Sequence, residues 1–147
     1  LRRPALNRIS QLKIHHASDA RTTAWLLLSW FSAQLGWTPV SRSENGVRLK
    51  NPAGNTIECR FGEEADAPTG GITRAKVVSG ASTLELGRER GGVLLLATLS
   101  DEGDSTVAHY PAGATALENL LTEELISGPK HKVYLKSLTA LENLLQA

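Results

Sequence analysis

The sequence contains no methionine and a single cysteine among its 147 residues. Cys59 therefore has no partner for a disulfide within the chain, and no apolar secretory segment precedes the first predicted strand. Both absences favour a reducing compartment, so we expect a cytoplasmic protein. Because the chain begins at Leu1 and has no initiator methionine, we also expect it to be part of a longer protein.

Long hydrophobic runs and a strong excess of charge are missing as well. The most apolar stretch, Trp25 to Phe31, is interrupted by Ser29 and is far too short to span a bilayer. The formal net charge is +1, and no basic run interleaved with aromatic residues indicates a nucleic-acid surface. We therefore expect neither a membrane nor a nucleic acid as a partner.

The segment around which the chain is organised, Ser18 to Trp37, predicts one long helix that ends at Leu35. Ser18 is a favourable N-cap, and Gly36 followed by Pro39 is a typical helix stop. The apolar arc covers more than half of the helical wheel, so we expect a buried core helix. Trp25 is the one large residue on the polar side of the wheel, near Arg21.

Most of the remaining chain before residue 112 predicts strands. An imperfect alternation over residues 8–16 predicts the first strand. The segment Val40 to Lys50 predicts a hairpin, because Asn45-Gly46 suits a type I′ turn, whose central residues take positive φ. Further candidates are Thr56 to Phe61, Ile72 to Val78, Ser82 to Gly87, Val93 to Leu99 and Thr106 to Tyr110. From Ala112 the leucine spacing changes to that of two amphipathic helices, separated by a stop at Ser127-Gly128-Pro129.

These elements predict a single α+β domain over residues 1–147. We expect a mostly antiparallel sheet of six to seven strands. We expect one long buried N-terminal helix and a C-terminal helical hairpin to pack on one face of that sheet. A chain of this length can bury one core of reasonable size.

No pattern of catalytic, cofactor-binding or metal-binding residues stands out. The only neighbouring histidines, His15 and His16, lie in a predicted strand and would point to opposite faces. No phosphate-binding loop or nucleophile elbow is present. Cys59 alternates onto the apolar side of its strand, which favours a buried, inert thiol over a reactive one. We therefore expect a protein that is not an enzyme and holds no cofactor or metal.

Basic residues that alternate away from apolar neighbours give one candidate interaction surface. If their strands are adjacent, they collect on one exposed sheet face; they are Arg48, Lys50, Arg60, Arg74 and Lys76. Such a face suits an anionic protein partner or a phosphorylated metabolite. The alternative is an ordinary solvated face on which Glu58 and Glu85 balance the charge. Arg21 and Trp25 are added as partner-contact candidates, although the C-terminal helices would equally cover Trp25.

Two stretches resemble a known family, the C-terminal domain of the glucose-6-phosphate dehydrogenase assembly protein OpcA. The first is a helix of the type A-x-L-L-x-x-W-x-x-x-x-L-G-W, carried by Ala24, Leu26, Leu27, Trp30, Leu35, Gly36 and Trp37. The second is the ending L-x-x-E-L … V-Y-x-x-x-L, carried by Leu121, Glu124, Leu125, Val133, Tyr134 and Leu138. Between them the similarity is one of pattern only.

The resemblance implies a non-catalytic partner that binds glucose-6-phosphate dehydrogenase and promotes its assembly or allosteric activation. It places the protein in carbohydrate metabolism, at the start of the oxidative pentose phosphate pathway. It also implies an additional N-terminal region in the full-length protein and, in photosynthetic bacteria, a link to thioredoxin-dependent control. The family motif carries no catalytic residues.

Overall fold

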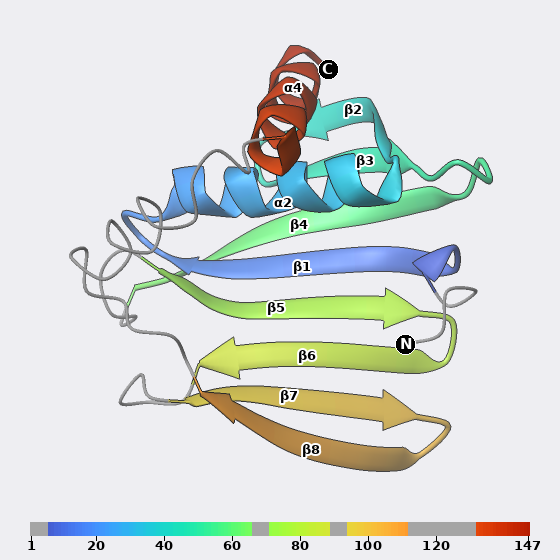
Figure 1. The fold of residues 1–147 in the computed structure, drawn as a ribbon, viewed down its shortest axis with the longest axis vertical. Helices are drawn as coiled ribbons and strands as arrows, with labels where there is room; N and C mark the ends of the chain where they lie inside the picture. The colour runs from blue at the N-terminus through green and yellow to red at the C-terminus, as the bar shows by residue number, and fades with distance from the viewer. Residues whose placement is uncertain (1–5, 66–70, 89–93, 112–131) are drawn as a thin grey trace.

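The computed structural model describes residues 6–65, 71–88, 94–111 and 132–147. Within these ranges the chain forms one eight-stranded sheet, whose strand order is β2-β3-β4-β1-β5-β6-β7-β8 (Figure 1). The strands are β1 (Ile9–Ala17), β2 (Thr38–Ser43), β3 (Gly46–Lys50), β4 (Thr56–Glu64), β5 (Ile72–Ser79), β6 (Ser82–Arg88), β7 (Leu94–Asp101) and β8 (Asp104–Pro111). The helices are α2 (Arg21–Leu35) and α4 (Lys132–Gln146).

The sheet confirms the mostly antiparallel α+β class, but it has more strands than expected. The hairpin expected over Val40 to Lys50 is present as β2 and β3, and β2 lies at the sheet edge. Pro39 and the absence of polar and apolar alternation make β2 a weak strand in sequence terms, and both features are tolerated at an edge. One neighbouring pair, β1 with β4, is parallel. The intervening chain, which contains α2, β2 and β3, provides the crossover that a parallel pair needs.

The organising helix α2 begins two residues later than predicted. Its N-cap position is Ala20, which has no side chain to cap the helix, so the predicted Ser18 cap is wrong. The backbone N–H of Ala20 instead donates to the carbonyl of Ala17 over 2.9 Å. The C-terminal stop is confirmed, because Gly36 takes a left-handed conformation with φ of 67°.

The burial of α2 also differs from the expected pattern. The buried residues are Ala24, Trp25, Leu28, Ser29 and Ser32, whereas Trp30 is 44% exposed. The hydroxyls of Ser29 and Ser32 donate to the carbonyls of Leu26 and Leu28, in the helix itself. Burying them therefore leaves no hydrogen bond unmade. The helix is accordingly buried along one side and is not the mostly buried element that its composition suggested.

The hydrophobic core lies between α2 and the strands at the β2 end of the sheet. Leu12 of β1, Leu49 of β3 and Ile57 of β4 are fully buried there, together with Leu28 of α2. Helix α4 packs against α2 and also touches β2, and it inserts Leu144 into the same core (Figure 1). Only this second helix of the expected C-terminal hairpin is described; the first, from Ala112 to Ser127, lies outside the described residues.

The β2–β3 turn shows that a glycine can be required for a reason other than φ. Asn45 and Gly46 do not have positive φ, so the expected type I′ turn is wrong. The turn comprises Glu44 and Asn45, and Gly46 is already the first residue of β3. A Cβ atom on Gly46 would lie 2.4 Å from the carbonyl oxygen of Cys59. Glycine at this position is therefore needed for the close approach of β3 to β4.

Candidate functional site

The strand register places all five predicted basic residues on one face of the sheet. Leu12, Ile57 and Val77 point toward the helices, and the residues that alternate with them point to the opposite side, which we call the open face. The cationic residues of the open face are Lys13, Arg48, Lys50, Arg60, Arg74 and Lys76. We call these six the cationic cluster. Its carboxylate neighbours on the same face are Glu58, Glu64 and Glu85.

Three cations of this cluster stand side by side across three strands. Arg60 of β4 is the register partner of Lys13 of β1, and Lys13 is in turn the partner of Lys76 of β5. Adjacent strands are about 4.8 Å apart, so these side chains begin within one strand spacing of each other. Like charges at directly opposite positions destabilise a sheet. The mutual repulsion of these three charges therefore opposes folding.

Ion pairs neutralise only part of the cluster. An Arg60 Nη2 atom lies 3.3 Å from a Glu58 carboxylate oxygen, at the exposed surface. Glu85 is shared between Arg74, at 3.5 Å, and Lys76, at 3.8 Å. Glu64 lies 3.4 Å from Nδ1 of His15. Within the described ranges, Lys13, Arg48 and Lys50 have no ion-pair partner.

Lys13 is the member of the cluster that the sequence reasoning left out. Its signal was present, because Lys13 lies between Leu12 and Ile14, both fully buried on the helix side of β1. The alternation of β1 is imperfect because a register irregularity interrupts it between Ile9 and Gln11. The pairing of β1 with β4 and β5, which are distant in sequence, determines which cations lie beside Lys13.

Arg21 and Trp25 do not belong to this surface. Both lie on α2, on the other side of the sheet, and Arg21 donates through Nη2 to the carbonyl of Glu44 over 2.8 Å. Trp25 is only 7% exposed, so of the two alternatives left open for it, an exposed contact residue or a covered side chain, the structure shows the covered one. Its ring packs against Phe61, with ring centroids 4.8 Å apart.

Arg42 explains why Trp25 is covered. Its guanidinium lies 4.9 Å from the Trp25 ring centroid, a cation–π distance, and its Nη1 donates to the carbonyl of Leu145 over 3.2 Å. Leu145 is in the last turn of α4, where a cation also interacts favourably with the helix dipole. Arg42 thus connects β2, α2 and α4. The pattern of β2 gave no sign of this role.

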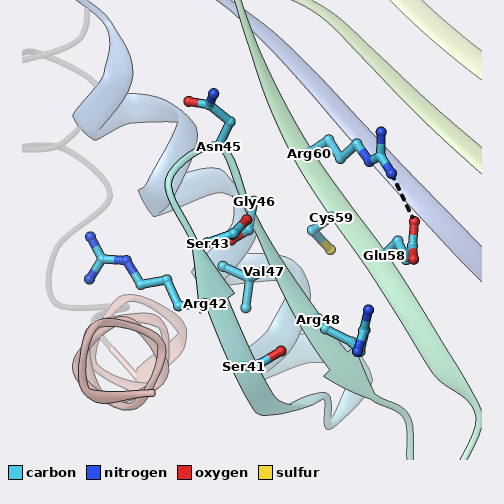
Figure 2. Close-up of a pocket in the computed structure, with 10 residues that line it drawn as sticks. All are labelled: Ser41, Arg42, Ser43, Asn45, Gly46, Val47, Arg48, Glu58, Cys59 and Arg60. Carbon is cyan, nitrogen blue, oxygen red and sulfur yellow. Dashed lines mark hydrogen bonds and ion pairs between the residues drawn. The ribbon is translucent and has the colours of Figure 1, made fainter.

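A depression of about 330 Å³ opens beside β2, β3 and β4 (Figure 2). The residues around it are Ser41, Arg42, Ser43, Asn45, Gly46, Val47, Arg48, Glu58, Cys59 and Arg60. Figure 2 shows Arg42 directed toward α4 and Arg60 directed toward Glu58 on the opposite side. Arg42 thus points away from the other two lining cations, Arg48 and Arg60, so the three do not converge on one small anion.

A second, smaller depression lies within the cationic cluster. It has a volume of about 140 Å³ and is lined by Gln11, Lys13, Glu58 and Arg60. Ligand pockets for metabolites typically measure about 300 to 1,000 Å³. This depression is smaller than that range and accommodates a side-chain carboxylate more readily than a whole metabolite.

Titratable groups elsewhere form no metal-binding arrangement within the described ranges. Cys59 is 2% exposed and faces the core, as its alternation predicted, and burial raises the pKa of its thiol to about 12. Nδ1 of the buried His16 donates to the carbonyl of Ala17 over 2.7 Å. In the parts of the chain that the structure describes, no helix is of a length and apolarity that would cross a membrane.

The chain also matches a known protein family over most of its length. Residues 2–138 match the family model for the C-terminal domain of the glucose-6-phosphate dehydrogenase subunit. The chain belongs to this family. The match extends over the whole sheet and part of α4, so it covers far more than the two motifs from which the OpcA resemblance was inferred. No curated protein sequence matches the chain.

Solved structures similar to this domain include oxidoreductases. The K102E mutant of KijD10, a 3-ketoreductase from Actinomadura kijaniata solved with TDP-benzene and NADP, matches with a TM-score of 0.62 and 11% identity. That match covers 95% of this chain and 51% of the reductase. Aldose-aldose oxidoreductase from Caulobacter crescentus matches with a TM-score of 0.50 and 16% identity, over 99% of this chain and 55% of the other. The domain therefore spans about half the length of these structures, and the likeness is one of fold.

Proposed function

We propose that this domain binds glucose-6-phosphate dehydrogenase as a non-catalytic subunit and promotes its assembly or allosteric activation. The observation that carries the proposal is the family match over residues 2–138, whose description names a subunit of that dehydrogenase. The partner is then the dehydrogenase itself, and the pathway is the oxidative pentose phosphate pathway in the cytoplasm.

The likeness to oxidoreductases does not argue against a non-catalytic role. At 11% to 16% identity it concerns the fold alone, and one fold supports many unrelated functions. The titratable residues of the open face support the proposal, because they lie spread across strands β1, β3, β4 and β5. Catalytic groups, by contrast, converge on one reacting atom.

A thioredoxin link, if the full-length protein has one, would depend on residues other than Cys59. Redox-sensing cysteines are accessible and have a lowered pKa. Cys59 is fully enclosed and its pKa is raised to about 12 by burial. The domain's contribution under this proposal is therefore binding, and the redox step belongs elsewhere in the assembly.

The proposal is tested by mixing the full-length protein with the dehydrogenase from the same organism and measuring NADP reduction. We expect a higher rate or a lower KM for glucose 6-phosphate in the mixture than with the dehydrogenase alone. The matched control is the same protein after heat unfolding, which should have no effect. Full-length protein alone should not reduce NADP. Unchanged rate, unchanged KM and unchanged dehydrogenase oligomerisation together would contradict the proposal.

A further inference from the structure

The positive charge of the cationic cluster is only partly offset by the ion pairs on its own face. Lys13 stands between Arg60 and Lys76 as their direct register partner, and like charges in this arrangement repel. Two carboxylates of the open face already pair with other cations, Glu58 with Arg60 and Glu85 with Lys76 and Arg74. Lys13, Arg48 and Lys50 are exposed and have no ion-pair partner in the described part of the chain. The surplus charge is thus available for an external anion.

The shape of the face favours a macromolecule over a small ligand. The depression within the cluster measures about 140 Å³. In the larger one beside it, Arg42 points away from Arg48 and Arg60 (Figure 2). The cluster itself extends over the four adjacent strands β3, β4, β1 and β5. A broad surface of shallow relief matches the contact area of a protein partner better than that of a metabolite.

The rest of the open face points to a protein and not to a nucleic acid. Beyond Glu85, the open face of β6 to β8 carries no Lys, Arg, Asp or Glu at the positions that the strand pairings define; its side chains include Thr83, Thr98, Val107 and His109. None of the open-face positions in β3 to β8 that these pairings define is Phe, Tyr or Trp, so no base-stacking platform of these residues accompanies the cations. A cationic half beside a neutral half is typical of a protein interface with separate polar and uncharged parts.

A second copy of this chain is a poor occupant of the same surface. Each open face carries six cations against three carboxylates on its strands, so two copies placed face to face would bring like charges together. A negatively charged partner is attracted to this face, whereas a second copy is repelled by it. The face therefore selects for a different protein with a carboxylate-rich surface.

We propose that the cationic cluster of the open face, centred on Lys13, docks a carboxylate-rich surface of a protein partner. This inference rests on the proposed function, in that the partner is taken to be the dehydrogenase. Three unpaired cations, Lys13, Arg48 and Lys50, provide the electrostatic attraction. Long-range attraction of this kind raises the association rate and makes binding sensitive to salt.

The test compares two double charge reversals in the full-length protein. Lys13→Glu/Arg48→Glu changes the open face, and Lys132→Glu/Lys136→Glu makes the same change of net charge on exposed positions of α4. Binding to the dehydrogenase is measured by surface-based kinetics at 50 and 300 mM NaCl. At 50 mM we expect the open-face variant to lose at least about tenfold in association rate. The α4 variant should stay within about twofold of wild type, and only the open-face variant should lose the salt dependence.

Different failures of this test have different meanings. If wild type binds and the open-face variant binds with equal rate and equal salt dependence, the docking surface is wrong while the proposed function stands. If wild type does not bind the dehydrogenase, both are wrong. A DNA duplex that binds wild type as tightly as the dehydrogenase does would overturn the assignment to a protein. Loss of wild-type self-association in the open-face variant would instead identify a second copy as the occupant.

Discussion

The two faces of the central strand β1 differ in burial and in charge, although their residues alternate along the same nine positions. Leu12 and Ile14 point toward α2 and are 0% and 1% exposed. Gln11 and Lys13 point to the open face, where they are exposed and Lys13 lies between two other cations. The helix side maximises burial, and the open side accumulates charge that folding does not need. In β1, therefore, residues that stabilise the fold alternate with residues that are free to bind a partner.

The largest expected effect concerns the chemistry of Cys59, on the helix side of β4. With its pKa raised from 9.0 to about 12, its thiolate population at pH 8 is about a thousandfold below that of an ordinary thiol. Labelling by a disulfide reagent should be correspondingly slow in the folded protein and fast in urea. Because the folded pKa lies above the unfolded value, stability should fall as pH rises between about 9 and 12. Fast labelling of folded protein would show that β4 opens readily.

Neighbouring substitutions on β1 give the next largest effect. Leu12→Ala removes a side chain that is 0% exposed, and such core truncations cost about 2 to 5 kcal/mol. Lys13→Ala should change the free energy of unfolding by less than about 0.5 kcal/mol. Urea unfolding monitored by circular dichroism measures both. Similar losses for the two variants would mean that the open face is covered and that the comparison of faces fails.

Replacing Arg42, on the helix side, should destabilise the protein by a smaller amount, whereas replacing Arg48, on the open face, should not. Arg42→Ala removes the cation–π contact with Trp25 and the hydrogen bond to the Leu145 carbonyl. The expected loss is about 1 to 2 kcal/mol, because both interactions are only partly shielded from water. Arg48→Ala on the adjacent strand is the control and should be nearly neutral. Equal thermal stability of the two variants would remove the role assigned to Arg42 in holding α4.

The smallest effect has the opposite sign. Lys13→Gln should raise the free energy of unfolding by about 0.2 to 0.5 kcal/mol at low salt, since it relieves repulsion from Arg60 and Lys76. The gain should vanish in 1 M NaCl, where charges are screened within about 3 Å. A loss of stability would indicate that Lys13 makes a favourable contact in the folded protein.

Local patterns predicted the fold class and the inward or outward direction of most strand residues. Alternation correctly placed Cys59 in the core and placed Arg48, Lys50 and Arg60 away from it, since strand parity is a property of adjacent residues. Alternation does not predict which strands lie next to each other in the sheet. The parallel pairing of β1 with β4, which brings Lys13 beside Arg60, joins residues far apart in sequence.

The helix α2 shows where periodicity misled the prediction. Its apolar arc covers so much of the circumference that the wheel does not determine which side faces the sheet. Ser29 and Ser32 could be buried because their hydroxyls bond to the carbonyls of their own helix. The wheel therefore put Trp25 on its polar side, whereas Trp25 is buried in the structure. The contact of Arg42 with the Trp25 ring depends on β2, a strand whose sequence shows no alternation.

The most direct measurement of the central claim is the dissociation constant of the full-length protein for the dehydrogenase, measured by isothermal titration at 50 and 300 mM NaCl. The account predicts saturable binding with a defined stoichiometry and an affinity at least about tenfold weaker at the higher salt concentration. Absence of binding at either salt concentration would contradict the claim that this domain is a binding subunit. Binding of unchanged affinity would contradict the claim that the cationic cluster drives it.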